Sequence, residues 1–240
     1  MWCRRTFTMK SEVAVILPAY NEAESIGRVI DEIQSLPLDC AIIVADSEST
    51  DETAEIAVSK GASVLSCHRG KGRAIREALQ RVSADYIFML DSDYTYPAQY
   101  ILPMLRLLRG YDDPPHWFMP EDAVYGLRVK LLPGAMSRVH RFGNKILTQL
   151  ANALFSPPWT CDLCSGMWGF RRGAADLLSR ELTADGFTLE ADIYSTLATH
   201  KCRLDYVEIA YRARQGTKPK LRLLDGFRIA WFLIKRRVQR

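Results

Sequence analysis

The chain has 240 residues, of which 48% are hydrophobic and 25% are charged, a composition typical of one globular domain. No apolar run reaches the roughly 18 residues that a membrane-spanning helix needs. The first apolar run, Val13–Leu17, is too short for a secretory signal. These features disfavour a transmembrane or secreted protein, and we expect a cytoplasmic one, either soluble or peripheral to the membrane.

The net charge of +4 is unevenly distributed along the chain. Residues 201–240 hold 12 Lys and Arg against 3 Asp and Glu, which gives +9, whereas residues 1–200 hold 20 against 25, which gives −5. A basic C-terminal segment suits phosphate groups, an anionic membrane surface or nucleic acid. Nucleic acid is the least favoured of the three, because the sequence contains no recognised nucleic-acid-binding module.

Short runs of β-branched and apolar residues alternate with helical patterns through the first 90 residues. They predict strands at Val13–Leu17, Cys40–Ala45, Ala62–Ser66 and Tyr86–Leu90, with helices at about 22–35, 51–59 and 71–82 between them. This strict alternation predicts an α/β fold with a parallel sheet and helices on both faces. Ligands bind such sheets beyond the carboxyl ends of the strands, so the polar residues that follow each strand are candidates for a site.

The second half of the chain is less regular. We expect a loop at 111–120, a strand at Val124–Val129 and a helix at Ala135–Phe155. Further on, the patterns predict a helix at Glu190–Thr199, a strand at Leu204–Ile209, a basic loop at Arg214–Lys220 and a helix at Leu221–Arg237. No internal repeat or second domain is apparent, so we expect a single domain over residues 1–240.

The C-terminal helix is predicted to be amphipathic. Its apolar residues repeat at spacings of three and four and form one stripe, namely Leu224, Phe227, Trp231, Ile234 and Val238. Basic residues surround or follow the stripe, namely Arg222, Arg228, Lys235, Arg236, Arg237 and Arg240. This pattern predicts a helix lying in a membrane interface. The alternative is a helix packed on the sheet, a contact that Ile229 and Leu233 could make from the other side.

The six cysteines include one Cys-x-x-Cys pair, Cys161 and Cys164. A structural zinc site usually needs a second pair of ligands, and the sequence offers none. We therefore expect reduced cysteines rather than a metal or redox centre.

Asp91-Ser92-Asp93 directly follows the fourth predicted strand. Two carboxylates one residue apart at a strand end can hold a hard cation that also accepts substrate phosphate oxygens. The alternative is a strand-end turn in which the two acids have only a structural role.

Three further motifs stand in the order and register of a known family. They are Pro18-Ala19-Tyr20-Asn21-Glu22, the turn from Asp46 to Thr53, and Gly70-Lys71-Gly72. With Asp91-Ser92-Asp93, they resemble the family 2 glycosyltransferases of GT-A fold over residues 13 to about 97. The resemblance implies a Rossmann-like, mostly parallel sheet, a nucleotide-sugar half at about 11–110, and a bound Mg²⁺ or Mn²⁺.

Motifs in the second half are similar to those of dolichyl-phosphate mannose synthases and related polyprenyl-phosphate glycosyltransferases. They are Tyr125–Arg128, Asp162–Met167, Gly186–Asp192 and Arg214–Leu221. That group transfers a hexose from a nucleotide sugar to a lipid phosphate. The resemblance therefore implies a UDP- or GDP-sugar donor, a dolichyl or polyprenyl phosphate acceptor, and an acceptor- and membrane-facing half at about 120–240.

The resemblance also assigns roles to individual positions. The side chains expected to bind the donor are Pro18, Tyr20, Glu22, Asp46, Lys71, Asp91, Ser92 and Arg128. Among them, Tyr20 would pack on the base and Asp46 would read its edge. Asp91 and Asp93 match the metal site, and Arg214 with Lys218 or Lys220 match basic groups around the phosphates. The candidate catalytic carboxylates are Asp93, Glu190 and Asp192.

The sequence departs from the family pattern at four places. Ser47 stands where a second Asp is common, Glu48 where the turn has Gly, and Thr95 where the mannose synthases often have Gln. An extra Pro219 leaves the choice between Lys218 and Lys220 open. These departures leave the donor and the metal ligation open, and they do not affect the expected fold.

We expect an inverting reaction, because direct in-line attack on the anomeric carbon inverts its configuration. A phosphate acceptor is already largely dianionic near neutral pH and needs no base, whereas an alcohol acceptor does. A soluble transferase with an alcohol acceptor therefore remains the alternative. A sugar-1-phosphate nucleotidyltransferase would need a glycine-rich loop where Pro18-Ala19-Tyr20-Asn21 stands. A non-catalytic binding module is disfavoured because Asp91 and Asp93 are both present.

Overall fold

The computed structural model describes residues 11–110, 119–215 and 223–239. The strands are β1 (Val13–Ala19), β2 (Cys40–Asp46), β3 (Ser63–Ser66), β4 (Tyr86–Met89), β5 (Ala123–Leu131), β6 (Trp168–Arg171) and β7 (Leu204–Tyr211). The helices are α1 (Ala23–Gln34), α2 (Thr53–Ser59), α3 (Lys71–Leu79), α4 (Ile101–Arg109), α5 (Arg138–Phe155), α6 (Arg172–Glu181), α7 (Leu189–Thr199) and α8 (Leu223–Val238), with a 3₁₀ turn at Ala98–Tyr100. No helix among the described residues is long and apolar enough to cross a membrane.

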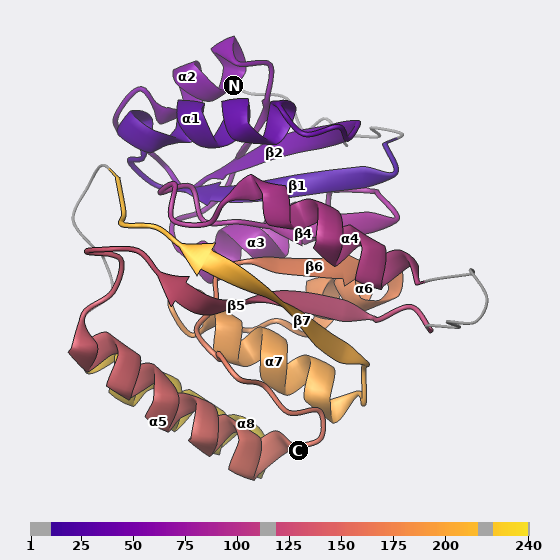
Figure 1. Ribbon diagram of the computed structural model, residues 1–240, viewed down its shortest axis with the longest axis vertical. Coiled ribbons are helices and arrows are strands. Elements are labelled where there is room, and N and C mark those ends of the chain that lie inside the picture. The colour runs from indigo at the N-terminus through magenta and orange to yellow at the C-terminus, as the bar shows by residue number, and fades with distance from the viewer. Residues whose placement is uncertain (1–10, 111–118, 216–222, 240) are drawn as a thin grey trace.

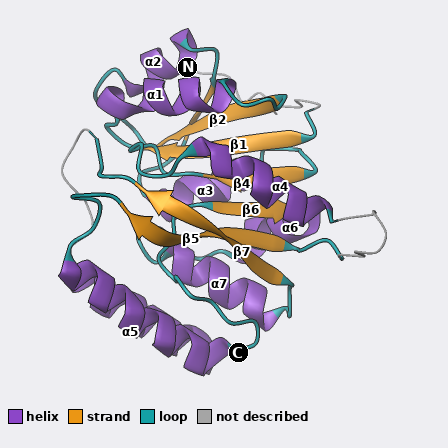
Figure 2. Ribbon diagram, viewed as in Figure 1, coloured by secondary structure: helices purple, strands orange, loops and turns teal. Residues whose placement is uncertain are grey.

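One seven-stranded sheet runs through the molecule in the order β3-β2-β1-β4-β6-β5-β7 (Figures 1 and 2). β1 pairs in parallel with β2 and β4, and β7 pairs in parallel with β5. The expected mostly parallel α/β fold is therefore confirmed. The single exception among these strands is β6, which runs antiparallel to both β4 and β5.

Three elements were not among the predicted ones, namely α4, β6 and α6. β6 is only four residues long and is buried between two strands, so its sequence shows neither alternation nor length. Helix α5 begins at Arg138, three residues after the predicted start, because Ser137 caps it. The Ser137 hydroxyl accepts a hydrogen bond from the backbone N–H of His140 at 3.2 Å.

The core lies in two layers, one on each face of the sheet. Successive residues of β1 point to opposite faces, so that Val13, Val15 and Leu17 belong to one layer and Ala14 and Ile16 to the other. Helices α1, α2 and α4 contribute buried residues to the first layer. Helices α3, α5, α6, α7 and α8 contribute to the second. Both faces of β1 are buried, which explains its continuous apolar run.

The parallel strands place their carboxyl ends along one edge of the sheet, at which the arrowheads of β5 and β7 can be seen in Figure 1. Ala19 at the end of β1 lies in register with Asp46 at the end of β2. Leu90 donates its N–H to Ile16 and continues the β4 pairing toward Asp91. The polar segments that follow β1, β2, β4 and β7 are thereby brought together.

Candidate functional site

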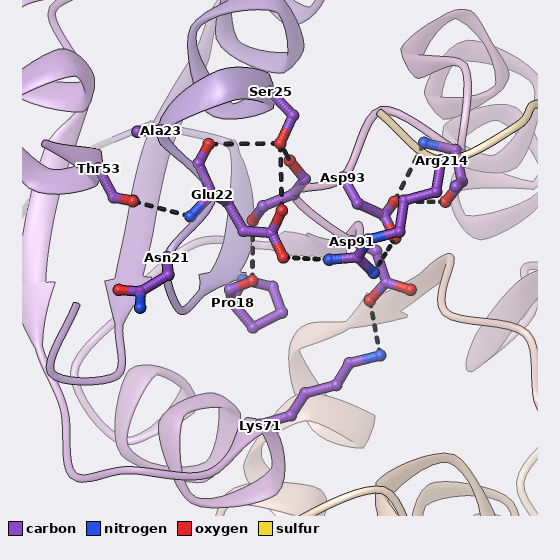
Figure 3. Close-up of polar contacts among 12 residues, drawn as sticks. Pro18, Asn21, Glu22, Ala23, Ser25, Thr53, Lys71, Asp91, Asp93 and Arg214 are labelled. Carbon is purple, nitrogen blue, oxygen red and sulfur yellow. Dashed lines mark hydrogen bonds and ion pairs between the residues drawn. The ribbon is translucent and has the colours of Figure 1, made fainter. Parts of the chain in front are cut away.

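A cluster of acidic and basic side chains forms at this edge (Figure 3). Glu22 follows β1, Asp91 and Asp93 follow β4, and Arg214 follows β7. Lys71 opens α3, and Glu190 stands in the first turn of α7. Residues that are up to 192 positions apart in sequence therefore meet at one site.

Lys71 joins two of the carboxylates. Its ammonium nitrogen lies 2.6 Å from Asp91 Oδ1 and 2.6 Å from Glu190 Oε1. Burial by itself would lower the pKa of Lys71, but the charges of Asp91 and Glu190 outweigh it and raise that pKa. Lys71 is therefore a fixed positive charge in the site and cannot serve as a base near neutral pH.

Arg214 joins the other two carboxylates. Its Nη1 donates to Asp93 Oδ2 at 2.7 Å, and its Nη2 donates to Glu22 Oε1. Thr95 fixes the other Asp93 oxygen, because its N–H and hydroxyl both donate to Oδ1, at 3.1 and 2.6 Å. Burial and the charge of Asp91 raise the pKa of Asp93, while Arg214 and Thr95 lower it by less.

Carboxylates gather at this site together with two cations. The ion pairs of the described residues join four carboxylates, those of Glu22, Asp91, Asp93 and Glu190, to Lys71 and Arg214. Among the described residues, no group of three His, Cys, Asp or Glu side chains could hold a metal by itself. The site thus fits an ion held by one or two carboxylates and completed by donor phosphates and water, as is usual for Mg²⁺.

Gly166 allows another segment to approach the Asp91 carboxylate closely. A Cβ at Gly166 would collide with the carboxyl group of Asp91, and the Gly166 N–H donates to the Tyr96 hydroxyl at 2.6 Å. Gly166 lies in the segment Asp162–Met167, which pointed to the family without giving this residue a role. The sequence alone did not show that a glycine is needed there to seat Asp91.

The predicted base-binding residues lie beside the cluster. Asp46 is buried, and its Oδ2 accepts from the Ser49 N–H at 3.2 Å. Its Oδ1 is buried without a hydrogen-bond partner in the described part of the chain, so the site has a free acceptor. Tyr20 accepts a hydrogen bond from Arg69 at 2.8 Å, and the guanidinium lies 4.4 Å from the ring centroid.

The loops around this site are held by their own hydrogen bonds. The carbonyl of Pro18 accepts from the Ser92 hydroxyl at 2.8 Å, which ties the first motif to the Asp-x-Asp loop. Glu48, which replaces the family glycine, has a φ of 60°, in the left-handed region that glycine adopts most easily. Glu48 therefore has a backbone conformation that a glycine would adopt without strain.

Arg128 lies in a buried ion pair. It forms a bidentate pair with Asp162, with Nε to Oδ2 at 2.7 Å and Nη2 to Oδ1 at 2.6 Å. Its guanidinium lies 5.1 Å from the centroid of the Tyr211 ring. One edge of the guanidinium thus holds Asp162, and a contact between Arg128 and the donor phosphates stays a prediction.

Asp192 has different contacts from Asp93 and Glu190, the other two candidate catalytic carboxylates. It is fully buried and accepts from the backbone N–H groups of Thr183 and Ala184 at 2.6 and 2.8 Å. Arg236 of α8 completes the arrangement at 3.1 Å. Asp192 is therefore held by structural contacts, whereas Glu190, in the same helical turn, reaches the site. The remaining predicted residues, Lys218 and Lys220, lie outside the described residues.

The family model for Glycosyl transferase family 2 matches residues 14–178, which is more than half of the chain. The chain belongs to glycosyl transferase family 2. This confirms the family predicted from the four motifs, and the match extends across most of the described sheet.

Among curated relatives, glycosyltransferase AglJ of Haloferax volcanii is 34% identical over 206 residues, covering 84% of this chain and 63% of that protein. The low-salt glycan biosynthesis hexosyltransferase Agl6 of the same organism is 30% identical, covering 92% of this chain and 53% of that protein. The chain thus spans less than two thirds of these two family 2 relatives. A dolichyl-phosphate hexose transferase of that organism is 30% identical, with 85% of both chains covered.

Solved structures confirm the GT-A fold of this family 2 chain. Glucosyl-3-phosphoglycerate synthase from Mycobacterium tuberculosis, in complex with Mn²⁺, UDP-glucose and phosphoglyceric acid, matches with a TM-score of 0.68 and 24% identity. That match covers 95% of this chain and 80% of the other. Mannosyl-3-phosphoglycerate synthase from Rubrobacter xylanophilus matches with a TM-score of 0.67 and 22% identity, over 95% of this chain and 73% of that one.

Proposed function

We propose that this protein is an inverting glycosyltransferase that moves a hexose from a UDP- or GDP-sugar to a dolichyl or polyprenyl phosphate at the cytoplasmic face of a membrane. The observation that carries the proposal is the cluster of Asp91, Asp93, Lys71 and Arg214 at the carboxyl ends of the strands. This arrangement suits a diphosphate leaving group held between fixed cations and a metal.

The donor would extend from Asp46 to Asp93. The free Oδ1 of Asp46 is an acceptor for an N–H on the edge of the base, and both uracil and guanine carry one. Tyr20, which follows β1, would pack on the base. The donor diphosphate would then approach Lys71, whose positive charge is maintained by Asp91 and Glu190.

Asp91 and Asp93 would hold Mg²⁺ or Mn²⁺ together with the donor phosphates. When bound, such an ion offsets the negative charge that develops on the leaving diphosphate. Arg214 keeps Asp93 in place, and Lys71 does the same for Asp91. The chain therefore orients both carboxylates before any ligand arrives.

A phosphate acceptor fits the contacts in the site. The Glu190 carboxylate is already engaged by the Lys71 ammonium at 2.6 Å. A phosphate monoester has a second pKa near 6 and is a nucleophile without help. Catalysis would then depend on orientation and on charge stabilisation. The 30% identity to a dolichyl-phosphate hexose transferase supports the same acceptor class.

The alternative is a family 2 transferase that uses an alcohol acceptor, with Glu190 as its base. A non-catalytic nucleotide-sugar-binding module ranks lower, because the two-carboxylate site and its cations are complete.

The test is an assay with a panel of radiolabelled nucleotide sugars, polyprenyl phosphate and Mg²⁺ or Mn²⁺, followed by organic extraction. We expect one sugar to enter the organic phase, with the opposite anomeric configuration to the donor by NMR. Addition of EDTA should abolish the signal. Label that stays in the aqueous phase as a glycosylated alcohol would favour the alternative, and absence of any transfer across the panel would overturn the proposal.

A further inference from the structure

An apolar surface is exposed along two helices that pack against one another, α5 and α8 (Figure 1). Phe142 on α5 is 67% exposed, and Phe227 and Trp231 on α8 are 76% and 67% exposed. We call this surface the α5–α8 face, and its exposed apolar members are Val139, Phe142, Ile146, Leu224, Phe227, Trp231, Ile234 and Val238. Exposed apolar side chains gathered on two contacting helices indicate a binding partner.

The exposure does not come from loose packing of the helices. On α8, Ile229 and Leu233 are buried in the core, on the opposite side of the helix from Trp231. On α5, Leu147 and Ala151 are buried in the same way. Each helix therefore has an inner apolar side that packs on the domain and an outer apolar side that faces solvent. On α8, the outer stripe and the inner contact through Ile229 and Leu233 are therefore both present. Helix α5 has the same two-sided arrangement.

The charges on the two helices have one sign. Helix α5 contains no Asp or Glu, and the one acid of α8, Asp225, is buried and bound to Arg228. The exposed basic side chains are Arg138, Arg141 and Lys145 on α5, and Arg228, Lys235 and Arg237 on α8. Arg236 is not among them, because it turns inward to Asp192. Six cations beside exposed aromatic residues match an anionic lipid surface.

The same charges argue against a second copy of the chain on this face. Two such faces placed together would oppose basic residues with basic residues, and like-charge contacts weaken association. Lipid headgroups carry the complementary charge, and the acyl boundary accepts the aromatic side chains.

We infer that α5 and α8 together form one membrane-binding surface for anionic lipid bilayers, and that neither helix suffices alone. The inference deepens the proposed function, since it names the surface that would bring the site to a lipid phosphate. α5 follows the carboxyl end of β5, and α8 begins nine residues after Arg214, a reach of at most about 30 Å. Both helices thus start near the edge of the sheet that carries the site.

The test is flotation of the full chain with phosphatidylcholine–phosphatidylglycerol vesicles, with pure phosphatidylcholine vesicles for comparison. Wild type should float with the anionic vesicles at low salt and stay down at high salt, because salt screens the attraction. Phe142→Glu on α5 and Trp231→Glu on α8 should each weaken binding roughly tenfold or more, since each removes an exposed aromatic group that would enter the acyl boundary of the bilayer. Lys235→Ala should weaken it about fivefold.

The matched control is Val58→Glu on α2, at the opposite end of the molecule in Figure 1, where the side chain is also 59% exposed. It should float like wild type. Circular dichroism should show that all variants are folded. If Phe142→Glu floats normally, the role of α5 is overturned. If wild type fails to float, the whole inference is overturned. A dimer in light scattering that both face variants convert to monomer would assign the face to a second copy.

Transfer to a short-chain, water-soluble prenyl phosphate separates this inference from the proposed function. Phe142→Glu and Trp231→Glu should keep that activity, because neither side chain belongs to the site. If the protein floats but transfers no sugar, the membrane-binding surface is retained and the proposed function is overturned. If it transfers sugar but does not float, the proposed function is retained and the membrane-binding surface is overturned.

Discussion

Asp91 and Asp93 are separated by one residue but are held by different partners. Asp91 is bound by Lys71 from α3, and Asp93 is bound by Arg214 after β7 and by Thr95 in its own loop. The loop alone therefore cannot fix both carboxylates. Their geometry depends on two segments that are distant in sequence, and a loss of either acid should affect turnover more than folding.

Asp93→Asn should lower turnover by roughly 100-fold or more, because the side chain that pairs with Arg214, and that would hold the proposed metal, loses its charge. The amide keeps the shape of the side chain, so the far-UV spectrum and melting temperature should change little. Steady-state kinetics at saturating Mn²⁺ measure the effect. Asp39→Asn, at an exposed position, is the matched control and should be neutral. Turnover of Asp93→Asn within a few-fold of wild type would contradict this role.

Glu190→Gln distinguishes the two acceptor classes. With a phosphate acceptor, the variant should retain appreciable turnover, because no hydroxyl has to lose a proton. The remaining effect should come from the lost ion pair with Lys71 and should appear mainly in the donor KM. Initial rates over a range of donor concentrations give both constants. A loss of kcat as complete as that of Asp93→Asn would instead assign Glu190 as a base and favour an alcohol acceptor.

The Cys-x-x-Cys pair should be chemically unequal. Burial raises the pKa of Cys164 to about 12, and burial also raises that of Cys67 to about 12. Only a thiolate reacts rapidly, and its fraction at these two positions grows only as pH rises toward that value. Cys161 is exposed. Iodoacetamide at about pH 7.5 should therefore label Cys161 and spare Cys67 and Cys164, as peptide mass spectrometry would show. Equal labelling of all three would contradict the burial seen here.

The motifs in the sequence predicted which residues belong to the site, but not which side chains those residues contact. Asp91, Asp93, Lys71 and Arg214 were all named from motifs, and the structure brings them together. Arg128 was named on the same grounds, yet its guanidinium is paired with Asp162, which is 34 positions away. A motif shows that an arginine is present, whereas the choice between a ligand and an internal carboxylate depends on the folded geometry.

At the scale of elements, the two glycines that flank Lys71 position α3. A Cβ at Gly70 would collide with the carbonyl of Asp185, and one at Gly72 with the carbonyl of Ala184. This segment is itself held by Asp192, which accepts from the N–H groups of Thr183 and Ala184. Asp192 therefore acts on the site indirectly, by seating the backbone against which Lys71 is placed.

Gly72→Ala should push the 184–185 segment away and destabilise the protein by about 1–3 kcal/mol, the usual cost of overpacking. Because Lys71 moves with α3, the donor KM should also rise. Thermal unfolding and donor titration measure the two effects. The control is Gly143→Ala on α5, where a Cβ meets nothing within 4 Å. That change should be neutral or stabilising by up to about 1 kcal/mol, since Ala favours helix. Equal effects at both positions would contradict the proposed contact.

The alternation of strands and helices up to β4 could be predicted because each element there has a clear period or apolar run. β6 could not, because four buried residues show no period, and its antiparallel direction follows from pairing rather than from its own sequence. The stripe on α8 was predicted with the correct outer and inner residues. The similar stripe on α5 was recognised as helical, but only the packing of the two helices shows that part of it faces solvent.

At the scale of the whole molecule, one sheet spans both halves of the chain. β4 lies in the predicted nucleotide-sugar half and β6 in the predicted acceptor half, and the two strands pair directly, with Phe88 opposite Gly169. The site draws residues from both sides of this junction, since Asp91 follows β4 and Glu190 lies on α7. A continuous sheet supports the expectation of a single domain, in which the halves should unfold together rather than separately.

Gly169→Ala tests this junction. A Cβ at position 169 would lie 2.6 Å from Cε1 of Phe88 and 3.1 Å from Cδ1 of Leu108, and both side chains are fully buried. The crowding should destabilise the protein by about 1–3 kcal/mol, since neither neighbour can move into solvent. If the halves form one cooperative unit, hydrogen exchange should accelerate equally in peptides from β1 and β2 and in peptides from β5 and β7. Denaturation curves followed by circular dichroism and by tryptophan fluorescence should also shift together. Gly173→Ala, where a Cβ meets nothing within 4 Å, serves as the control and should leave both sets of peptides unchanged. Faster exchange confined to β5 and β7 would mean that the acceptor half unfolds on its own, and the single-domain expectation would then have to be replaced by two units that share a sheet.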